Sequence, residues 1–206
     1  MTQQAQLPMT AEEVANAAFL LLGLRPLQSF TEIGRDEVVV ASALYELMVQ
    51  ELQEAHPWTF CTGQQHLEND PDPPLDRYET AWHLPRFQTG TPYYIHTVRR
   101  SDIPVRYEIM AGRIYADVGK DEDPIAEYSY RVEEAWWPPS FKMAAVFRMA
   151  FMMATAVTRN AGQMKAMQDG YELQVARAKF RDSKSVTVKR MDQTRFLRNR
   201  NPLTSR

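Results

Sequence analysis

The stretch EAWWPPSFKMAAVF, residues 134–147, sets two tryptophans against two prolines and then continues as a helix former. Proline holds φ near the helical value, and it lacks an N–H group that the first helical turn leaves unbonded in any case. Pro138 and Pro139 therefore predict the start of a helix. Trp136 and Trp137 stand just before it, where large rings can fill the junction between returning strands and a helical layer.

Helical periodicity continues after this start. Apolar residues recur at helical spacing from Met143 to Val157, and Gly162 offers a break. A last helix is predicted to about Asp182.

Two further helices are predicted near the N-terminus. Thr10 followed by Glu13 is typical of a capping box, so a first helix is expected as far as Leu22. A second helix is expected from Asp36, whose charge suits the helix dipole, to Pro57, which cannot continue the hydrogen-bond ladder.

Between the helices the apolar period falls to two, as in β-strands. Residues alternate from Tyr78 to Leu84, and VRYEIMAGRIYADV, residues 105–118, is typical of a hairpin that turns at Ala111 and Gly112. Four or five such strands predict one small sheet packed on the helices.

A second aromatic hinge precedes this region. In HPWTFCT, residues 56–62, Trp58 and Phe60 follow the helix-ending Pro57. We expect the two aromatic hinges to bracket the β-rich insertion and to lock its base to the helices.

The predicted fold is α+β, mainly an α-helical bundle of about four helices with a β-rich insertion and an extended basic C-terminal tail. Residues 1–62 and 134–185 are assigned to the helical domain, residues 63–133 to the insertion and residues 186–206 to the tail. A chain of 206 residues with 44% hydrophobic content is long enough for one compact domain of this kind.

Composition narrows the function only a little. A formal net charge of −2 does not suit a protein that binds nucleic acid by bulk charge. The single cysteine, Cys61, rules out an intrachain disulfide and is expected to be a half-buried hydrophobe in a reducing cytosol. No secretion signal is recognised, and the longest apolar run, AAFLLLGL, is shorter than the ~20 residues that span a bilayer, so a soluble protein is expected.

Motifs for metal, nucleophilic or phosphate chemistry are missing from the sequence. The histidines have no spacing typical of metal ligands, no GxSxG elbow occurs, and the glycines form no phosphate-binding loop. These histidines are His56, His66, His83 and His96. The sequence therefore predicts no metal, no cofactor and no catalytic residue.

Acidic residues gather in two segments of the β-rich region. They are Glu68, Asp70, Asp72 and Asp76, and Asp121, Glu122 and Asp123. Solvated loops explain them more simply than catalysis, since a glycosidase needs two carboxylates that face each other across a cleft. A peptidoglycan-cleaving enzyme using Glu68 or Glu122 remains one alternative function.

The C-terminal segment VTVKRMDQTRFLRNRNPLTSR has six Lys or Arg residues against Asp192 alone. Its composition predicts an extended tail that does not fold by itself. Met191, Phe196 and Leu197 add apolar anchors that DNA binding does not require, so docking into a protein groove is favoured. A DNA-binding module that acts through this tail is the other alternative.

The order of these features resembles the head-to-tail adaptor, or connector, family of tailed phages. Its closest branch looks like tail tubular protein A, the gatekeeper of short-tailed phages. The resemblance covers about residues 11–182 and rests on the order and spacing of aromatic and small residues. The stretches that carry it are ANAAFLLLGLRPLQSF, HPWTF, HLPRF, AEYSYRV and WWPPSF.

The resemblance implies a non-enzymatic virion protein at the head–tail junction, assembled in the host cytoplasm. Such adaptors form a dodecameric ring under the portal protein and attach the tail nozzle, which is tail tubular protein B-like, or other tail proteins. Viral DNA passes through the lumen of the ring without sequence-specific binding, and no membrane is involved.

The resemblance also implies where the contacts lie. The C-terminal tail would dock on the portal, and exposed aromatic residues would serve contacts between subunits or with the tail. The portal-docking candidates are Lys189, Arg190, Arg195, Phe196, Leu197, Arg198 and Arg200. The interface candidates are Tyr93, Tyr94, Trp136 and Trp137.

Overall fold

The computed structural model describes residues 9–72, 77–86, 92–158 and 160–185. In these residues the α-helices are α1 (Ala11–Leu21), α2 (Asp36–Glu54), α3 (Pro139–Met153) and α4 (Ala161–Ser185). The strands are β1 (Thr62–His66), β2 (Thr80–His83), β3 (Tyr94–Arg100), β4 (Ile103–Val105), β5 (Tyr107–Met110), β6 (Arg113–Ala116) and β7 (Ile125–Ser129). Short 3-10 turns, η1 (Thr59–Cys61) and η2 (Glu134–Trp136), mark the two hinges, and a π-helical turn, η3 (Ala154–Thr158), follows α3.

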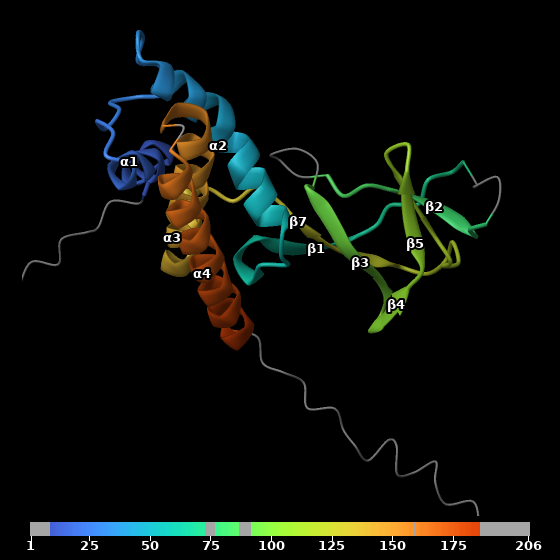
Figure 1. Cartoon of the computed structure of the whole chain (residues 1–206). Coiled ribbons are helices and arrows are strands. Elements are labelled where there is room, and N and C mark those ends of the chain that lie inside the picture. Colours follow the sequence, from blue (N-terminus) through green and yellow to red (C-terminus); the bar gives the residue numbers. More distant parts are fainter. Residues whose placement is uncertain (1–8, 73–76, 87–91, 159, 186–206) are drawn as a thin grey trace, which may run out of the picture.

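The helices form one half of the molecule and the strands the other (Figure 1). Helix α3 is central to the helical half, where it packs against α1, α2 and α4. The chain leaves this half through η1 and returns to it through η2.

Local sequence signals place the starts of α1 and α3 where they are predicted, while α2 ends at Glu54, before the predicted stop at Pro57. The Thr10 side chain accepts a hydrogen bond from the Glu13 amide at 3.3 Å, and the Glu13 carboxylate accepts one from the Thr10 amide at 3.0 Å. Helix α3 begins at Pro139 with Pro138 in the N-cap position. Both expectations are confirmed, because each depends on neighbouring residues alone.

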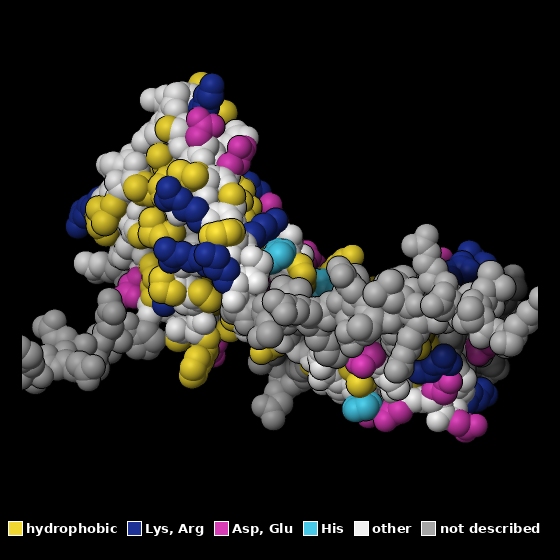
Figure 2. Space-filling model, turned by 90° about the horizontal axis from the view of Figure 1, so that it is seen from below, with side chains coloured by type: hydrophobic (Ala, Val, Ile, Leu, Met, Phe, Trp, Pro, Cys, Tyr) yellow, Lys and Arg dark blue, Asp and Glu magenta, His cyan; other side chains and the backbone are white. Residues whose placement is uncertain are grey.

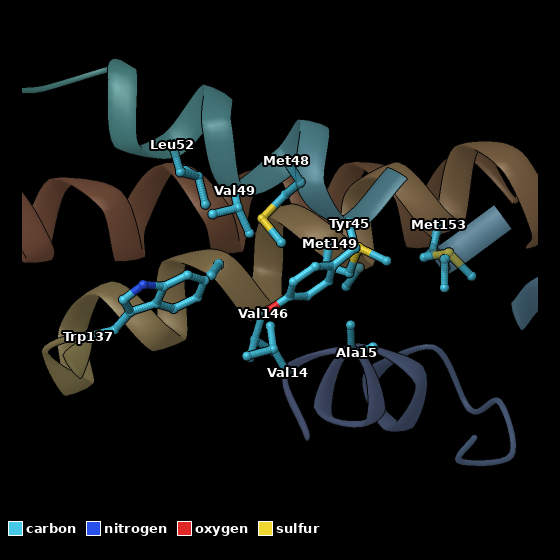
Figure 3. Packing of buried hydrophobic residues seen from close by; sticks show 14 of the residues in the cluster. Val14, Ala15, Tyr45, Met48, Val49, Leu52, Trp137, Val146, Met149 and Met153 are labelled. Carbon is cyan, nitrogen blue, oxygen red and sulfur yellow. The ribbon is translucent and has the colours of Figure 1, made fainter. Parts of the chain in front are cut away.

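The helical core is built from facing stripes of α1, α2 and α3 (Figure 3). Helix α1 contributes Val14 and Ala15, α2 contributes Tyr45, Met48, Val49 and Leu52, and α3 contributes Val146, Met149 and Met153. Met149 and Met153 are therefore core residues, whereas Met143, the first residue of the predicted apolar stripe, is 45% exposed.

The segment Pro139–Thr158, which is α3 with η3, is the one described helix whose length and apolar composition would allow it to cross a membrane. Its place in the fold accounts for that composition, since other helices cover it on several sides. The core helix of a globular protein can have the same length and apolar composition.

The strands form two antiparallel sheets. One has the order β1-β7-β3-β4 and the other the order β2-β6-β5. The predicted hairpin is confirmed as β5 and β6, which turn through Ala111 at φ 48° and Gly112 at φ 74°, the left-handed pair that a tight hairpin needs.

The predicted fold class is wrong because it makes the β region a small insertion in a helical bundle. The described residues form an α+β fold of four helices and two antiparallel sheets with seven strands, and not a mainly helical bundle carrying one small sheet. Both sheets contribute to a second buried cluster, separate from the helical core. Its members are Leu67, Trp82, Ile95, Val98, Ile114, Ala116, Val118, Ala126 and Tyr128.

Candidate functional site

The two aromatic hinges meet at one ring, that of Phe141 in the first turn of α3. Trp58 and Trp137 each contact it edge to face, with ring centroids 5.1 and 5.0 Å away. All three rings are buried. The Trp58 indole donates to the Leu52 carbonyl at 2.7 Å and the Trp137 indole donates to the Val132 carbonyl at 2.8 Å. The prediction that aromatic residues lock the base of the β region to the helices is confirmed for Trp58 and Trp137.

A buried amide fixes the returning chain against α2. The Gln53 side chain donates to the Val132 carbonyl at 3.1 Å and accepts from the Val132 amide at 3.3 Å, as a paired strand would. Gln53 has no exposed surface. Both polar groups of this buried amide are therefore used in holding the second hinge in place.

A charged network lies at the exit of the β region. Arg131 bonds Glu46 of α2 at 2.8 Å and Glu134 of η2 at 2.6 Å, and the Tyr45 hydroxyl donates to Glu134 at 3.1 Å. Partial burial opposes the charge of Arg131, but the hydrogen bonds to Glu46 and Glu134 raise its pKa on balance. Burial, followed by the charge of Glu134, raises the pKa of Tyr45. The network therefore keeps a charged guanidinium between α2 and the second hinge.

Two adjoining hollows open on the surface around these hinges. The first, called the hinge groove here, has a cavity volume of about 280 Å³. Its lining consists of Trp58, Thr59, Phe60, Pro138, Pro139, Ser140, Phe141, Ala178, Arg181 and Asp182. The second is wider, at about 560 Å³, and Phe60 lines both. Tyr130 and Trp136 also line that second hollow.

The four predicted interface aromatics lie in different environments. Trp136 is 76% exposed and Tyr94 is more than half exposed. The Tyr93 hydroxyl donates to Glu46 at 3.3 Å, and burial, followed by the charge of Glu46, raises its pKa to about 12. Trp137 is only 2% exposed, so the expectation that its ring is exposed is wrong, because that ring is part of the hinge core.

The predicted interface role of these aromatics stays a prediction. Trp136 and Tyr94 keep large exposed rings for it. The predicted portal-docking residues, Lys189 to Arg200, lie outside the described residues.

Glu68, Asp70 and Glu122 have separate surroundings among the described residues, and Asp76 lies outside the described residues. Glu122 binds Arg100 at 2.8 Å and the Gly119 amide at 3.1 Å, which closes a turn. Glu68 lines a hollow of about 40 Å³, while ligand pockets usually measure about 300–1,000 Å³. Asp70 is buried and its carboxylate lies 3.0 Å from the Arg113 guanidinium.

Cys61 belongs to the helical core. The Cys61 thiol is fully buried beside the first hinge, and this burial raises its pKa to about 12. Such a thiol is a poor nucleophile, because the thiolate is the reactive form. In the part of the chain that the structure describes, no group of three or more His, Cys, Asp or Glu residues is placed to hold a metal ion.

Sequence reasoning missed the polar contacts of the site. Gln53 and Val132 are far apart in the chain, as are Glu46 and Arg131, and no periodic pattern joins them. It also missed that the end of α4 forms a wall of the hinge groove through Ala178, because contacts between distant helices leave no local signal.

Comparison with known proteins gives no identification: no family model matches the chain, and no curated protein matches it.

Proposed function

We propose that the protein is a head-to-tail adaptor of a phage virion, a structural protein that forms a ring beneath the portal and attaches the tail nozzle. The single observation that supports this best is the apolar surface of α2 and α4. Val39 and Leu47 of α2, and Leu173 and Phe180 of α4, are each more than half exposed. The spacing of each pair, eight and seven residues, keeps its two members near one face of the helix.

Helix α4 packs one face on the core through the partly buried Met164, Met167, Tyr171 and Val175, and Leu173 and Phe180 lie outside that contact. Among the α4 side chains that the structure describes, Ala178 alone is buried. Exposed apolar side chains that recur along a helix are typical of a surface that a partner covers. Two different apolar helix faces on one chain suit head-to-tail contacts, which close into rings when the rotation between subunits allows it.

The resemblance in sequence order supplies the rest of the proposal. In such a ring, viral DNA would pass through the lumen without sequence-specific recognition, and residues 186–206 would dock on the portal. The complex would belong to the virion tail after assembly in the host cytoplasm.

The test combines the purified protein with portal rings from the same source and inspects them by negative-stain electron microscopy. We expect a second tier of density on the narrow end of the portal. Deleting residues 186–206 should abolish this tier while the truncated chain keeps its thermal unfolding transition, since residues between Val14 and Ala178 build the described helical core.

Two point variants test the helix faces. Leu47→Glu and Phe180→Glu place a charge on exposed apolar positions, so each should prevent the tier without lowering the melting temperature. Gln168→Glu, a matched addition of charge at an exposed position of α4, should leave the tier intact.

Three other results would contradict the adaptor proposal or favour an alternative function. If no tier forms over a range of salt concentrations, the adaptor proposal fails. If instead the protein clears a peptidoglycan zymogram and Glu68→Gln or Glu122→Gln abolishes the clearing, the protein is an enzyme. Salt-dependent DNA binding by residues 186–206 with a slope that follows their Lys and Arg content would favour the DNA-binding alternative.

A further inference from the structure

We infer that the hinge groove binds an acidic segment of a partner protein, which inserts one aromatic or large aliphatic side chain between the first hinge and the end of α4. The hollow itself has none of the exposed apolar residues of α2 and α4 in its lining, but its basic rim shares one side of α4 with Leu173 and Phe180. The inference does not depend on the adaptor proposal, because its test measures binding by the free chain.

The groove has the size and lining for one ring. Phe60, Pro138 and Pro139 line it beside the buried rings of Trp58 and Phe141. A cavity of about 150 Å³ can hold benzene, so a cavity volume of about 280 Å³ accommodates a phenyl or indole side chain. Rigid aromatic and proline walls lose little conformational freedom when a ligand binds, which favours affinity.

The rim beside the groove is positively charged. Arg177, Arg181 and Lys184 follow one another at intervals of four and three residues along α4, so they share one side of the helix, and all three are exposed. Neither Arg177 nor Arg181 has an ion pair with any residue that the structure describes. Seen from below, where the end of α4 faces the viewer, Lys and Arg side chains gather among hydrophobic ones on the helical half (Figure 2).

One carboxylate, that of Asp182, lines the groove and offsets part of this positive charge. The Asp182 carboxylate accepts hydrogen bonds from the Thr59 hydroxyl at 2.6 Å and from the Thr59 amide at 3.1 Å. Its role is to fasten α4 to the first hinge. Arg177, Arg181 and Lys184 outnumber this single carboxylate, so the rim keeps a net positive charge. Complementary charge on a partner speeds encounter and selects acidic segments.

The charge also argues against the protein's own C-terminal segment as the occupant. Residues 186–206 have six basic residues and one acidic residue, so they would meet Arg177, Arg181 and Lys184 with charge of the same sign. An acidic segment from another protein gains attraction at the same place. Trp136, in the hollow that shares Phe60 with the groove, offers a second exposed ring for the segment to contact.

The experiment selects ligands from a displayed library of random 12-residue peptides on the full-length protein. Peptides retained by the wild type are expected to share an aromatic or large aliphatic residue flanked by Asp or Glu. The best of them, made with a fluorescent label, is then measured by anisotropy against three variants.

The variants separate the groove from the rest of the surface. Ser140→Tyr fills the groove from the first turn of α3 and should weaken binding at least ten-fold. Arg181→Glu reverses a rim charge and should weaken binding about five-fold. Lys165→Glu makes the same change of charge at the other end of α4 and should leave affinity within two-fold. Thermal unfolding of each variant identifies any that does not fold.

Three outcomes would overturn the inference. Retained peptides that are basic or lack a large apolar residue would show that the groove selects other chemistry. A peptide of residues 186–206 that binds more tightly than any library member would make the protein's own tail the occupant. Concentration-dependent dimerisation of the wild type that Ser140→Tyr abolishes would make it a second copy of the chain.

Discussion

Gly170 of α4 lies so close to Phe147 of α3 that a Cβ atom added to the glycine would stand 2.4 Å from two carbons of the phenylalanine ring. The two helices therefore approach each other at a position where only hydrogen fits. Replacing Gly170 with alanine should force the ring aside at a cost of about 1–3 kcal/mol, which exceeds the ~1 kcal/mol that alanine gains in helix propensity.

We therefore expect Gly170→Ala to lower the free energy of unfolding by about 1 kcal/mol in urea titrations. Gly162→Ala in the same helix is the control, because its nearest neighbour is an Asn160 oxygen at 3.4 Å, and it should be neutral or slightly stabilising. Adding Phe147→Leu to Gly170→Ala should recover part of the loss. Additive effects of these two changes would contradict the contact.

The adjacent tryptophans of the second hinge should behave as opposites. Trp137→Ala removes a buried ring and its hydrogen bond to Val132 and should cost about 3–5 kcal/mol of unfolding free energy. Trp136→Ala removes an exposed ring and should change that free energy by no more than about 0.5 kcal/mol. Chemical denaturation measures both, and equal losses would contradict the assignment of one ring to the core and one to the surface.

The Gln53 amide should be required for the second hinge to stay in place. Gln53→Leu keeps the volume but leaves the buried Val132 amide without its acceptor, at a cost of about 1–3 kcal/mol. Gln53→Glu restores the acceptor but sets a carboxylate oxygen against the Val132 carbonyl, so its loss of stability should be larger at neutral pH than in mild acid. A loss in Gln53→Glu that does not vary with pH would show that the amide does not donate to that carbonyl.

Stability should fall as the pH is lowered through the range in which histidine titrates. Burial lowers the pKa of His56 and of His96 below the usual value of about 6.5. The unfolded chain, with its ordinary histidine pKa, then binds more protons than the folded chain in mildly acidic solution, so the unfolding free energy decreases as the pH falls below about 6.5. The double variant His56→Gln/His96→Gln should flatten this dependence in urea titrations at a series of pH values. An unchanged slope would assign the pH dependence to other groups.

The parts of the fold that the sequence predicts correctly depend on near neighbours. The capping box of Thr10 and Glu13 and the turn at Ala111 and Gly112 each follow from a few adjacent residues, and both are present. A period of two identifies strands but does not say which strands pair. Strand β1, with the sequence TGQQH, has almost no apolar alternation because it is an edge strand, so the division into two sheets could not be anticipated.

The site shows the same limit. The sequence gives no reason to bury one tryptophan of the second hinge rather than the other. The direction of the backbone at η2 buries Trp137 and exposes Trp136. The basic residues near the end of α4 are visible in the sequence, but the groove beside them exists only because the first hinge packs against the same helix.

The pairing of β1 with β7 has a consequence for how the chain folds. Thr62 stands opposite Ser129, and the Tyr130 amide donates to the Cys61 carbonyl at 3.1 Å, so the segment between them begins and ends at one point. Once this ladder has formed, the end of α2 and the beginning of α3 are neighbours, and most of the entropy needed to bring them together has already been lost. The β half thus holds the end of α2 next to the beginning of α3. We expect the helical core to form fastest when β1 pairs with β7 before the helices pack.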